Sequence, residues 1–287
     1  MATIWEETKV QTAKMKGRPL KEKLGYFWEY YKIQTAIIVG CAALIISIIH
    51  AIATSKDYAL SIIIINSIAN ELSDVEYKTG TGEDVNTGSN ATLCDKWIAE
   101  LSELIEYNPK KYEITIDSSM SLGTNTNTAN AEYANSQKLA AMMSGKTIDV
   151  LIANTELFER YAQNEYYFDL RDLYSADEIA SFEEAGLLYY TDASTFADYE
   201  DTNLNVFEDQ AKYKVDHSNP ESIENPIPVG FFLKEGTSLG DCGIYSYLTA
   251  DDLYQGYPQQ GVMGIPINTP RVEAAKIAVE YFLEGAK

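Results

Sequence analysis

The longest apolar segment of the chain runs from Thr35 to Ala53 and contains no Asp, Glu, Lys or Arg. As a helix it would extend about 28 Å, close to the hydrocarbon thickness of a bilayer. A helix that is apolar on all sides over this length is typical of a membrane span rather than of a buried core helix. We therefore predict a transmembrane helix over residues 35–54, in contact with the lipid bilayer.

The charges that flank this segment predict its orientation. Residues 1–34 carry seven Lys/Arg and four Asp/Glu, a net charge of +3, which leaves −24 for the rest of a chain whose total is −21. Lys56 is the only basic residue close behind the span. The positive-inside rule then places the N-terminus in the cytoplasm. We expect a single-pass protein of a bacterial cell membrane, with a basic cytoplasmic or interfacial segment over 1–34 and an extracellular domain over 57–287.

Two other interpretations of the apolar segment fit less well. A cleaved signal peptide has a short basic lead and an apolar run of about 7–15 residues, whereas 34 residues precede this longer run. Ile38 to Cys41 matches a lipoprotein cleavage box, which normally closes the apolar run, but mostly apolar residues continue beyond Cys41. We therefore favour an uncleaved span without lipidation.

An aromatic stretch, LKEKLGYFWEYYK, covers residues 20–32 directly before the span. Several of its apolar residues fall on one helical face. The stretch is either a helix lying in the headgroup layer, with the aromatics as an interfacial belt, or a helical extension of the span. The sequence leaves both open.

Beyond the span, apolar runs of strand length alternate with helical patterns. The run from Tyr58 to Asn66 is continuous and β-branched, as in a strand that is buried on both faces. A polar loop is expected over 118–130. Thr155 is the expected N-cap of the helix predicted over 156–163. The predicted strands are 58–66, 112–117 and 148–153, and the predicted helices are 93–105, 131–144 and 156–163. This order predicts an α/β domain with a largely parallel sheet covered by helices.

The second half of the domain is less regular. Residues 172–226 are acidic and rich in Tyr, with short helical candidates at 176–185 and 195–199, and their fold is left open. Strands are predicted at 227–233, 244–248 and 261–268, of which the first two would pair as a hairpin or meander. A helix starts at Thr269-Pro270, with Pro in its first turn.

Two stretches resemble the type 2 extracellular (periplasmic) solute-binding proteins. They are KLAAMMSGKTIDVLIANTELFERYAQNEYYFDLRDL, from Lys138, and GVMGIPINTPRVEAAKIAVEYFLEG, from Gly261. The resemblance implies the periplasmic binding protein fold and a ligand held without catalysis. Those proteins have two lobes, but only about 30 residues separate Leu233 from Gly261 here. The sequence therefore resembles one lobe, carried on a membrane span.

Ligands of parallel α/β sheets sit beyond the carboxyl ends of the strands. With the resemblance, this geometry selects the polar residues that end the first three predicted strands. The candidate ligand-binding residues are Asn66, Ser67, Ser118, Ser119, Asn154 and Thr155.

Other motifs indicate no catalytic, metal or cofactor site. Gly236 to Gly240 matches G-x-S-x-G, but no helix is expected to follow it and no His comes later in the chain, so we expect a turn. Asp201 to Lys212 starts like a calcium loop, but lacks Gly at position six and Glu at position twelve. Gly80 to Gly82 is too short for a dinucleotide loop. No zinc ligand set is evident.

Charge and cysteine content bound the partners. The acidic outer domain argues against nucleic acid. Cys94 and Cys242 allow a disulfide, although two free, buried thiols are favoured. We expect a non-enzymatic binding or accessory module that takes a small solute or a membrane protein partner. The alternative is a structural or assembly subunit of an envelope membrane complex, with no small ligand.

Overall fold

The structure is a computed structural model. It describes residues 17, 19–67, 77–78, 84–85, 90–122, 129–196, 215–241, 253–254, 257–258 and 260–284. The chain divides into two compact units, Met1–Lys56 and Asp57–Lys287.

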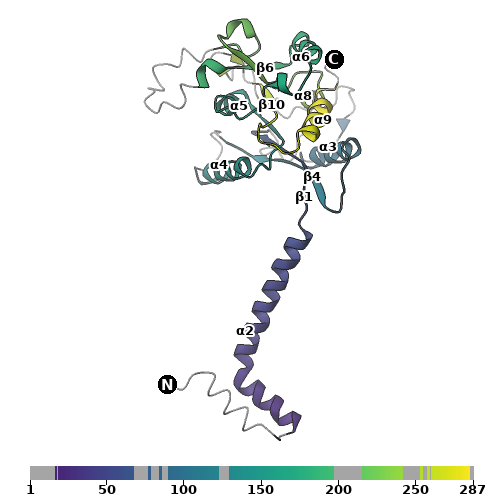
Figure 1. The fold of residues 1–287 in the computed structure, drawn as a ribbon, viewed down its shortest axis with the longest axis vertical. Helices are drawn as coiled ribbons and strands as arrows, with labels where there is room; N and C mark the ends of the chain where they lie inside the picture. Colours follow the sequence, from purple (N-terminus) through teal and green to yellow (C-terminus); the bar gives the residue numbers. More distant parts are fainter. Residues whose placement is uncertain are drawn as a thin grey trace. The chain divides into compact units, whose positions relative to one another are not determined.

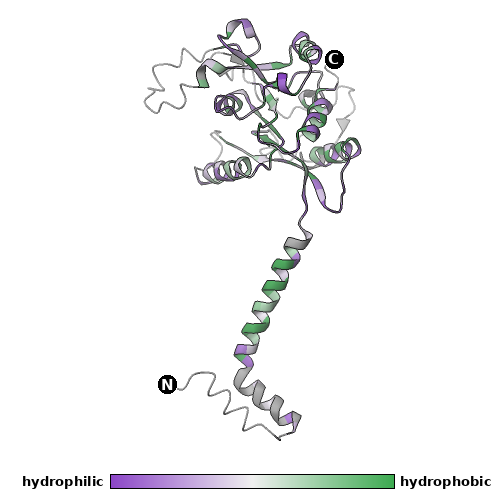
Figure 2. Ribbon diagram, viewed as in Figure 1, coloured by the Kyte–Doolittle hydropathy of each residue, from purple (hydrophilic) through white to green (hydrophobic). Residues whose placement is uncertain are grey.

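The first unit contains one long helix, α2, over Leu20–Thr54. Its segment Lys32–Ala51 is long and apolar enough to cross a membrane, and 0% of that segment is buried. Figure 2 shows the apolar residues along this helix. A core helix would bury such residues against neighbouring elements. The aromatic stretch before the predicted span, residues 20–32, forms the first part of this same helix.

The second unit is built on a six-stranded sheet with the order β4-β1-β5-β10-β7-β6. Strand β1 is parallel to both of its neighbours, β4 and β5, whereas the other three pairings are antiparallel. The strands are β1 Asp57–Ile65, β4 Tyr112–Met120, β5 Val150–Asn154, β6 Leu188–Asp192, β7 Pro226–Phe232 and β10 Gly261–Gly264. The α/β class is confirmed, but the sheet is mixed: the predicted parallel arrangement holds only for β4, β1 and β5.

Helices cover both faces of the sheet. Figure 1 shows α3 and α9 on one side, and α4 and α5 on the other. The helices are α3 Asn90–Leu104, α4 Ala129–Ser144, α5 Thr155–Ala162, α6 Ala176–Glu184, α8 Ser238–Asp241 and α9 Val272–Leu283. Short 3-10 turns lie at Leu170–Asp172, Ala193–Thr195 and Pro220–Ser222, and two small ribbons pair β2 Tyr77–Lys78 with β3 Asp84–Val85 and β8 Leu253–Tyr254 with β9 Tyr257–Pro258.

The continuous apolar run of β1 explains this layering. Successive side chains of a strand point to opposite faces. Ile62 and Ile64 therefore join one core cluster, which includes residues of α3 and α9, while Ile63 and Ile65 join a second cluster with residues of α4 and α5. Burying each such side chain contributes about 1.5–3 kcal/mol. A strand of this kind is stable only when both faces are covered.

Two predicted boundaries were wrong. Strand β4 continues to Met120, where it pairs with Ile65, so Ser118 and Ser119 lie in a strand and not in the predicted loop. Strand β10 ends at Gly264 rather than at residue 268. The reason is Pro266, which has no amide hydrogen for the ladder and forms an isolated bridge with Tyr167.

The N-cap of α5, strand β6 and the segments at 244–248 and 195–199 also bear on the predictions for this unit. Asn154, not Thr155, is the N-cap of α5. Strand β6 was not predicted, and β7 pairs with β6 and β10. The predicted strand 244–248 lies outside the described residues, as do residues 197–199 of the short helix expected over 195–199.

Two glycines allow α5 to pack closely on the sheet. The Phe158 ring of α5 stacks on Tyr167, with the ring centroids 4.1 Å apart. A Cβ atom added to Gly230 would lie 2.6 Å from Phe158 Cζ, and one added to Gly264 would lie 2.7 Å from the same atom. Both distances are shorter than van der Waals contact, so a side chain at either position would displace the ring.

We predict that Gly230→Ala lowers the free energy of unfolding by about 1–3 kcal/mol, the usual cost of overpacking a core. Urea denaturation of the two proteins measures this difference. Phe158→Leu, which removes ring atoms from the same space, should cost less in the Gly230→Ala background than in the wild-type chain. Strictly additive costs would show that Gly230 and Phe158 do not compete for space.

Candidate functional site

The strand-end residues selected from the sequence come together in part. The Asn66 side chain donates from Nδ2 to Oδ1 of Asn154 (2.9 Å), and the Ser67 hydroxyl donates to the carbonyl of Ser118 (3.1 Å). The carboxyl ends of β1, β4 and β5 therefore meet, as parallel strands require. This juxtaposition follows from the parallel pairing of β1 with both neighbours.

The polar atoms at this edge bond largely to the protein itself. Asn66 has a φ of 59°, a conformation that Asn tolerates better than most residues, and its amide exchanges hydrogen bonds with the backbone of Leu122 (2.7 and 2.8 Å). The Thr155 hydroxyl bonds to the backbone of Gln260. Asn66, Ser67, Asn154 and Thr155 are all buried. Their contacts join strand ends, and ligand binding there stays a prediction.

Ser118 and Ser119, the two serines of β4, contact different side chains. The Ser118 hydroxyl lies 3.7 Å from the thiol of Cys94, a free cysteine whose pKa is raised by burial. Ser119 is exposed and donates to Asp117. Cys242 lies outside the described residues.

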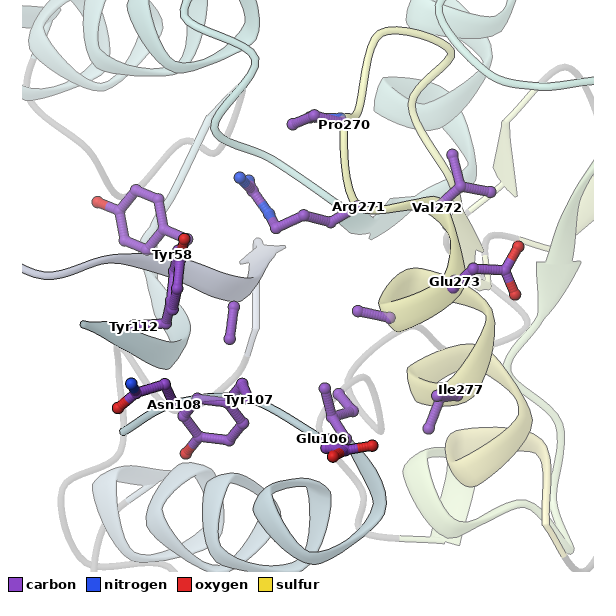
Figure 3. A pocket seen from close by; sticks show the side chains of 13 residues that line it. Tyr58, Glu106, Tyr107, Asn108, Tyr112, Pro270, Arg271, Val272, Glu273 and Ile277 are labelled. Carbon is purple, nitrogen blue, oxygen red and sulfur yellow. The ribbon is translucent and has the colours of Figure 1, made fainter. Parts of the chain in front are cut away.

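A cavity of about 540 Å³ lies at the opposite edge of the sheet. Figure 3 shows its walls: the start of α9 on one side, and the first residues of β1 and β4 with the loop after α3 on the other. Three tyrosines line it, Tyr58, Tyr107 and Tyr112. The remaining lining is mostly apolar, with Glu106, Glu273 and Arg271 as its charged groups.

A buried carboxylate fixes Arg271 in the wall of this cavity. Asp149 is 0% exposed and precedes β5. Its Oδ2 accepts from the Ser61 amide (2.7 Å) and from Arg271 Nε (2.8 Å), and its Oδ1 accepts from the Thr269 hydroxyl. Three segments distant in sequence thus meet on one side chain.

The rest of the Arg271 guanidinium is less well satisfied. Its carbon lies 5.9 Å from the centroid of the Tyr58 ring. Its Nη2 atom is buried and has no hydrogen-bond partner among the described residues. Leaving a buried donor unpaired costs about 1–3 kcal/mol, and more for a charged group. Because the atom is enclosed by protein, a ligand in the cavity cannot reach it without a movement of the side chain.

A second cavity, of about 530 Å³, lies between β1, β4 and α4 and shares Tyr58 with the first. Lys138 and Asp117 line it and form an ion pair at 2.7 Å. Burial alone would raise the pKa of Asp117, but the hydrogen bonds from Lys138 and Ser119 outweigh it and lower that pKa. The pair occupies the polar side of this cavity.

A third polar cluster is buried in the core around Glu159 of α5. The Glu159 carboxylate accepts hydrogen bonds from the hydroxyls of Tyr189 (2.8 Å) and Thr191 (3.0 Å). His217 Nδ1 lies 3.7 Å from the same carboxylate, and the His217 ring stacks on Tyr189. Burial raises the pKa of Glu159, although His217 and the hydroxyls oppose this effect.

The remaining candidates from the sequence were the G-x-S-x-G stretch, a calcium loop, a dinucleotide loop and a zinc site. A short helix, α8, starts at Ser238 inside the G-x-S-x-G stretch and ends at Asp241, so the helix does not begin after the stretch as it does in a nucleophile elbow. The Thr237 hydroxyl, directly before this helix, donates to the Lys234 carbonyl (2.7 Å) and accepts from the Gly240 amide (2.9 Å). These two hydrogen bonds form a closed turn. Within the described residues, no three His, Cys, Asp or Glu side chains are grouped to hold a metal ion. Residues 201–212 and 80–82 fall outside that part of the chain.

Comparison with known proteins adds no relative. No family model matches the chain, and neither the curated proteins nor the solved structures include a match.

We predict that Arg271→Met lowers the free energy of unfolding by about 3–5 kcal/mol, because it leaves the buried Asp149 carboxylate without its cation. Combining it with Asp149→Asn should recover much of that loss, because the buried charge is then removed as well. Chemical denaturation of the single and double variants measures both effects. A loss below about 1 kcal/mol for Arg271→Met, the range of an exposed pair, would contradict a buried ion pair.

Glu159 should make stability depend on pH. A raised pKa in the folded state means that the protonated carboxyl is favoured there, so this contribution is complete below the unfolded pKa, about 4.3, and is lost as pH rises through the folded pKa. Each tenfold difference in proton affinity corresponds to about 1.4 kcal/mol. Glu159→Gln keeps a neutral side chain of the same shape.

Urea unfolding of the wild-type chain and of Glu159→Gln, measured at a series of pH values from below the unfolded pKa upward, tests this pH dependence. The wild-type chain should lose stability relative to Glu159→Gln as pH rises. A difference between the two that stays constant with pH would show that burial does not raise the pKa of Glu159.

Proposed function

We propose that the chain is a single-pass membrane protein whose C-terminal domain is an extracellular, non-enzymatic binding module resembling one lobe of a type 2 solute-binding protein. The apolar segment Lys32–Ala51 supports the membrane anchor. The net charge of +3 on residues 1–34 supports a cytoplasmic N-terminus. The domain that follows would then lie outside the cell, where a binding module meets solutes.

The cavity beside α9 carries this proposal. Its volume of about 540 Å³ falls within the range of about 300–1,000 Å³ that is usual for small-molecule sites. Such sites are lined mainly by apolar and aromatic side chains with a few polar groups that orient the ligand. Tyr58, Tyr107 and Tyr112 supply the aromatic surface, and Arg271 and Glu106 supply charge.

A second function is a structural or assembly subunit of an envelope complex with no small ligand. The observation in its favour is the connection between α2 and β1, which consists of Ser55 and Lys56 alone. Two residues give the domain little reach for delivering a solute to a distant partner. In that case a membrane protein would be the partner.

A thermal-melt screen of the full chain in detergent micelles separates the two functions. The panel contains sugars, amino acids, short peptides and calcium. A ligand held at about 100 times its dissociation constant should stabilise the domain by about 2.7 kcal/mol. We expect at least one compound class to raise the melting temperature.

Two variants locate the site. Ile277→Trp fills the cavity beside α9 and should abolish the shift, whereas Asn154→Ser at the other edge should leave it. The reverse pattern would assign binding to the strand ends predicted from the sequence. No shift across the panel, from a domain that melts cooperatively, would contradict the binding function and favour the assembly subunit.

A further inference from the structure

A turn at the amino end of the sheet lies directly beside the first residue of β1. This turn covers residues 108–111, between α3 and β4, and is called the basal turn below. The Lys111 amide donates to the Asn108 carbonyl (3.0 Å), and the Lys110 amide donates to Oδ1 of the Asn108 side chain (3.0 Å). The Lys111 carbonyl accepts from the Asp57 amide (2.9 Å). The basal turn is therefore fixed against the start of β1.

Chain connectivity keeps the basal turn near the proposed membrane span. The apolar segment ends at Ala51, α2 ends at Thr54, and β1 begins at Asp57. Three helical residues and three extended ones span at most about 16 Å, in any orientation of the domain. The headgroup layer covers about 5–8 Å of that distance. Because a lysine charge sits on a long, flexible stem, lysines of this turn can reach lipid phosphates.

The basal turn carries two lysines without ion-pair partners. Lys110 and Lys111 are exposed, and neither forms an ion pair with another residue that the structure describes. Lys56, next to Asp57 in the chain, is exposed as well. Elsewhere in the domain, carboxylates pair with the cations of Lys96, Lys138, Arg160, Arg171 and Arg271. The lysines of the basal turn are available to an external anion.

Nearby carboxylates offset this positive charge only in part. Asp57 is exposed and follows Lys56 directly. Glu106 and Glu113 flank the turn in sequence, but Glu106 lines the cavity beside α9 and Glu113 lines the second cavity. The two lysines of the turn line neither cavity. The exposed turn itself therefore presents positive charge.

Tyrosines flank the basal turn on both sides. Tyr112 follows it and is 40% exposed, and Tyr107 precedes it and is half-buried. Figure 3 shows both rings on the side of the cavity opposite α9. Tyrosine is enriched at membrane–water interfaces, because its ring suits the apolar side and its hydroxyl suits the wet side. Exposed lysines next to tyrosines are therefore suited to an interfacial contact.

We infer that the basal turn docks on the surface of the bilayer, with Lys110 and Lys111 bound to the phosphates of anionic lipid headgroups and Tyr112 in the interfacial layer. The inference rests on the proposed membrane anchor and gives the domain a second membrane contact. Beyond residue 34 the chain carries a net charge of −24, so an anionic surface repels most of the domain. Docking through the basal turn would therefore direct the amino ends of β1 and β4 toward the membrane.

Methyl NMR of the full chain in nanodiscs tests this contact. The discs contain a lipid whose headgroup chelates gadolinium, which broadens the signals of nearby methyl groups. Ile114 lies two residues after Tyr112 in β4, whereas Ile65 ends β1 at the opposite edge of the sheet. We expect Ile114 to broaden more in discs that contain phosphatidylglycerol than in discs of phosphatidylcholine alone, while Ile65 changes little between the two.

Charge variants assign the contact to the two lysines. Lys110→Gln with Lys111→Gln should lower the ratio of docked to undocked domain about 25-fold, since each basic residue near an anionic surface contributes about fivefold, and should remove the extra broadening of Ile114. Lys110→Arg with Lys111→Arg keeps both charges and should retain the broadening. Lys96→Gln with Arg160→Gln is the matched control, because it removes two positive charges from exposed positions of α3 and α5, and it should retain the broadening as well.

Equal broadening of Ile114 in the two kinds of disc would overturn the inference and leave the membrane anchor standing. The same conclusion would follow if the glutamine pair at the basal turn behaved like the matched control. A chain that does not enter nanodiscs would contradict the membrane anchor and the inference together.

Discussion

The buried carboxylate of Asp149 holds the candidate site together. It accepts hydrogen bonds from the Ser61 amide of β1, from the Thr269 hydroxyl and from Arg271. These contacts fix the segment that leads into α9 against β1, although 122 positions separate Asp149 from Arg271. A charge buried to this degree is tolerated only when it is paired and hydrogen-bonded. The start of α9 is therefore tied to β1, and the cavity between them follows from that placement.

Hydrophobic periodicity predicts much of this fold. The apolar run of β1 requires cover on both faces, and the patterns of α3, α4 and α9 supply helices for it, as the two core clusters show. Strand direction is a different matter, because it depends on where the chain returns and not on local period. The antiparallel half was missed for that reason. Strand β6 had a signal in its run of Leu188, Tyr189, Tyr190 and Thr191, which suits a strand, but the acidic residues around it obscured the pattern.

The candidate site could be predicted only in part. Asn66 and Asn154 meet because the carboxyl ends of neighbouring parallel strands coincide, a rule that the sequence pattern can use. The same rule does not tell whether polar side chains face a ligand or one another. Here the side-chain amides of Asn66 and Asn154 are hydrogen-bonded to each other at 2.9 Å. The cavity beside α9 depends on helix placement and on the pairing of Asp149 with Arg271, neither of which is encoded in local sequence.

The central claim is that a ligand binds between α9 and the starts of β1 and β4. Methyl NMR of the full chain in nanodiscs, with isoleucine δ-methyl labelling, tests it most directly during titration with the compound that raises the melting temperature most in the screen. Ile105 and Ile277 line this cavity, whereas Ile63 lines the second cavity on the other face of the sheet. Our account predicts that the Ile105 and Ile277 signals shift together while Ile63 stays in place. A shift of Ile63 alone, or of none of the three, would contradict it.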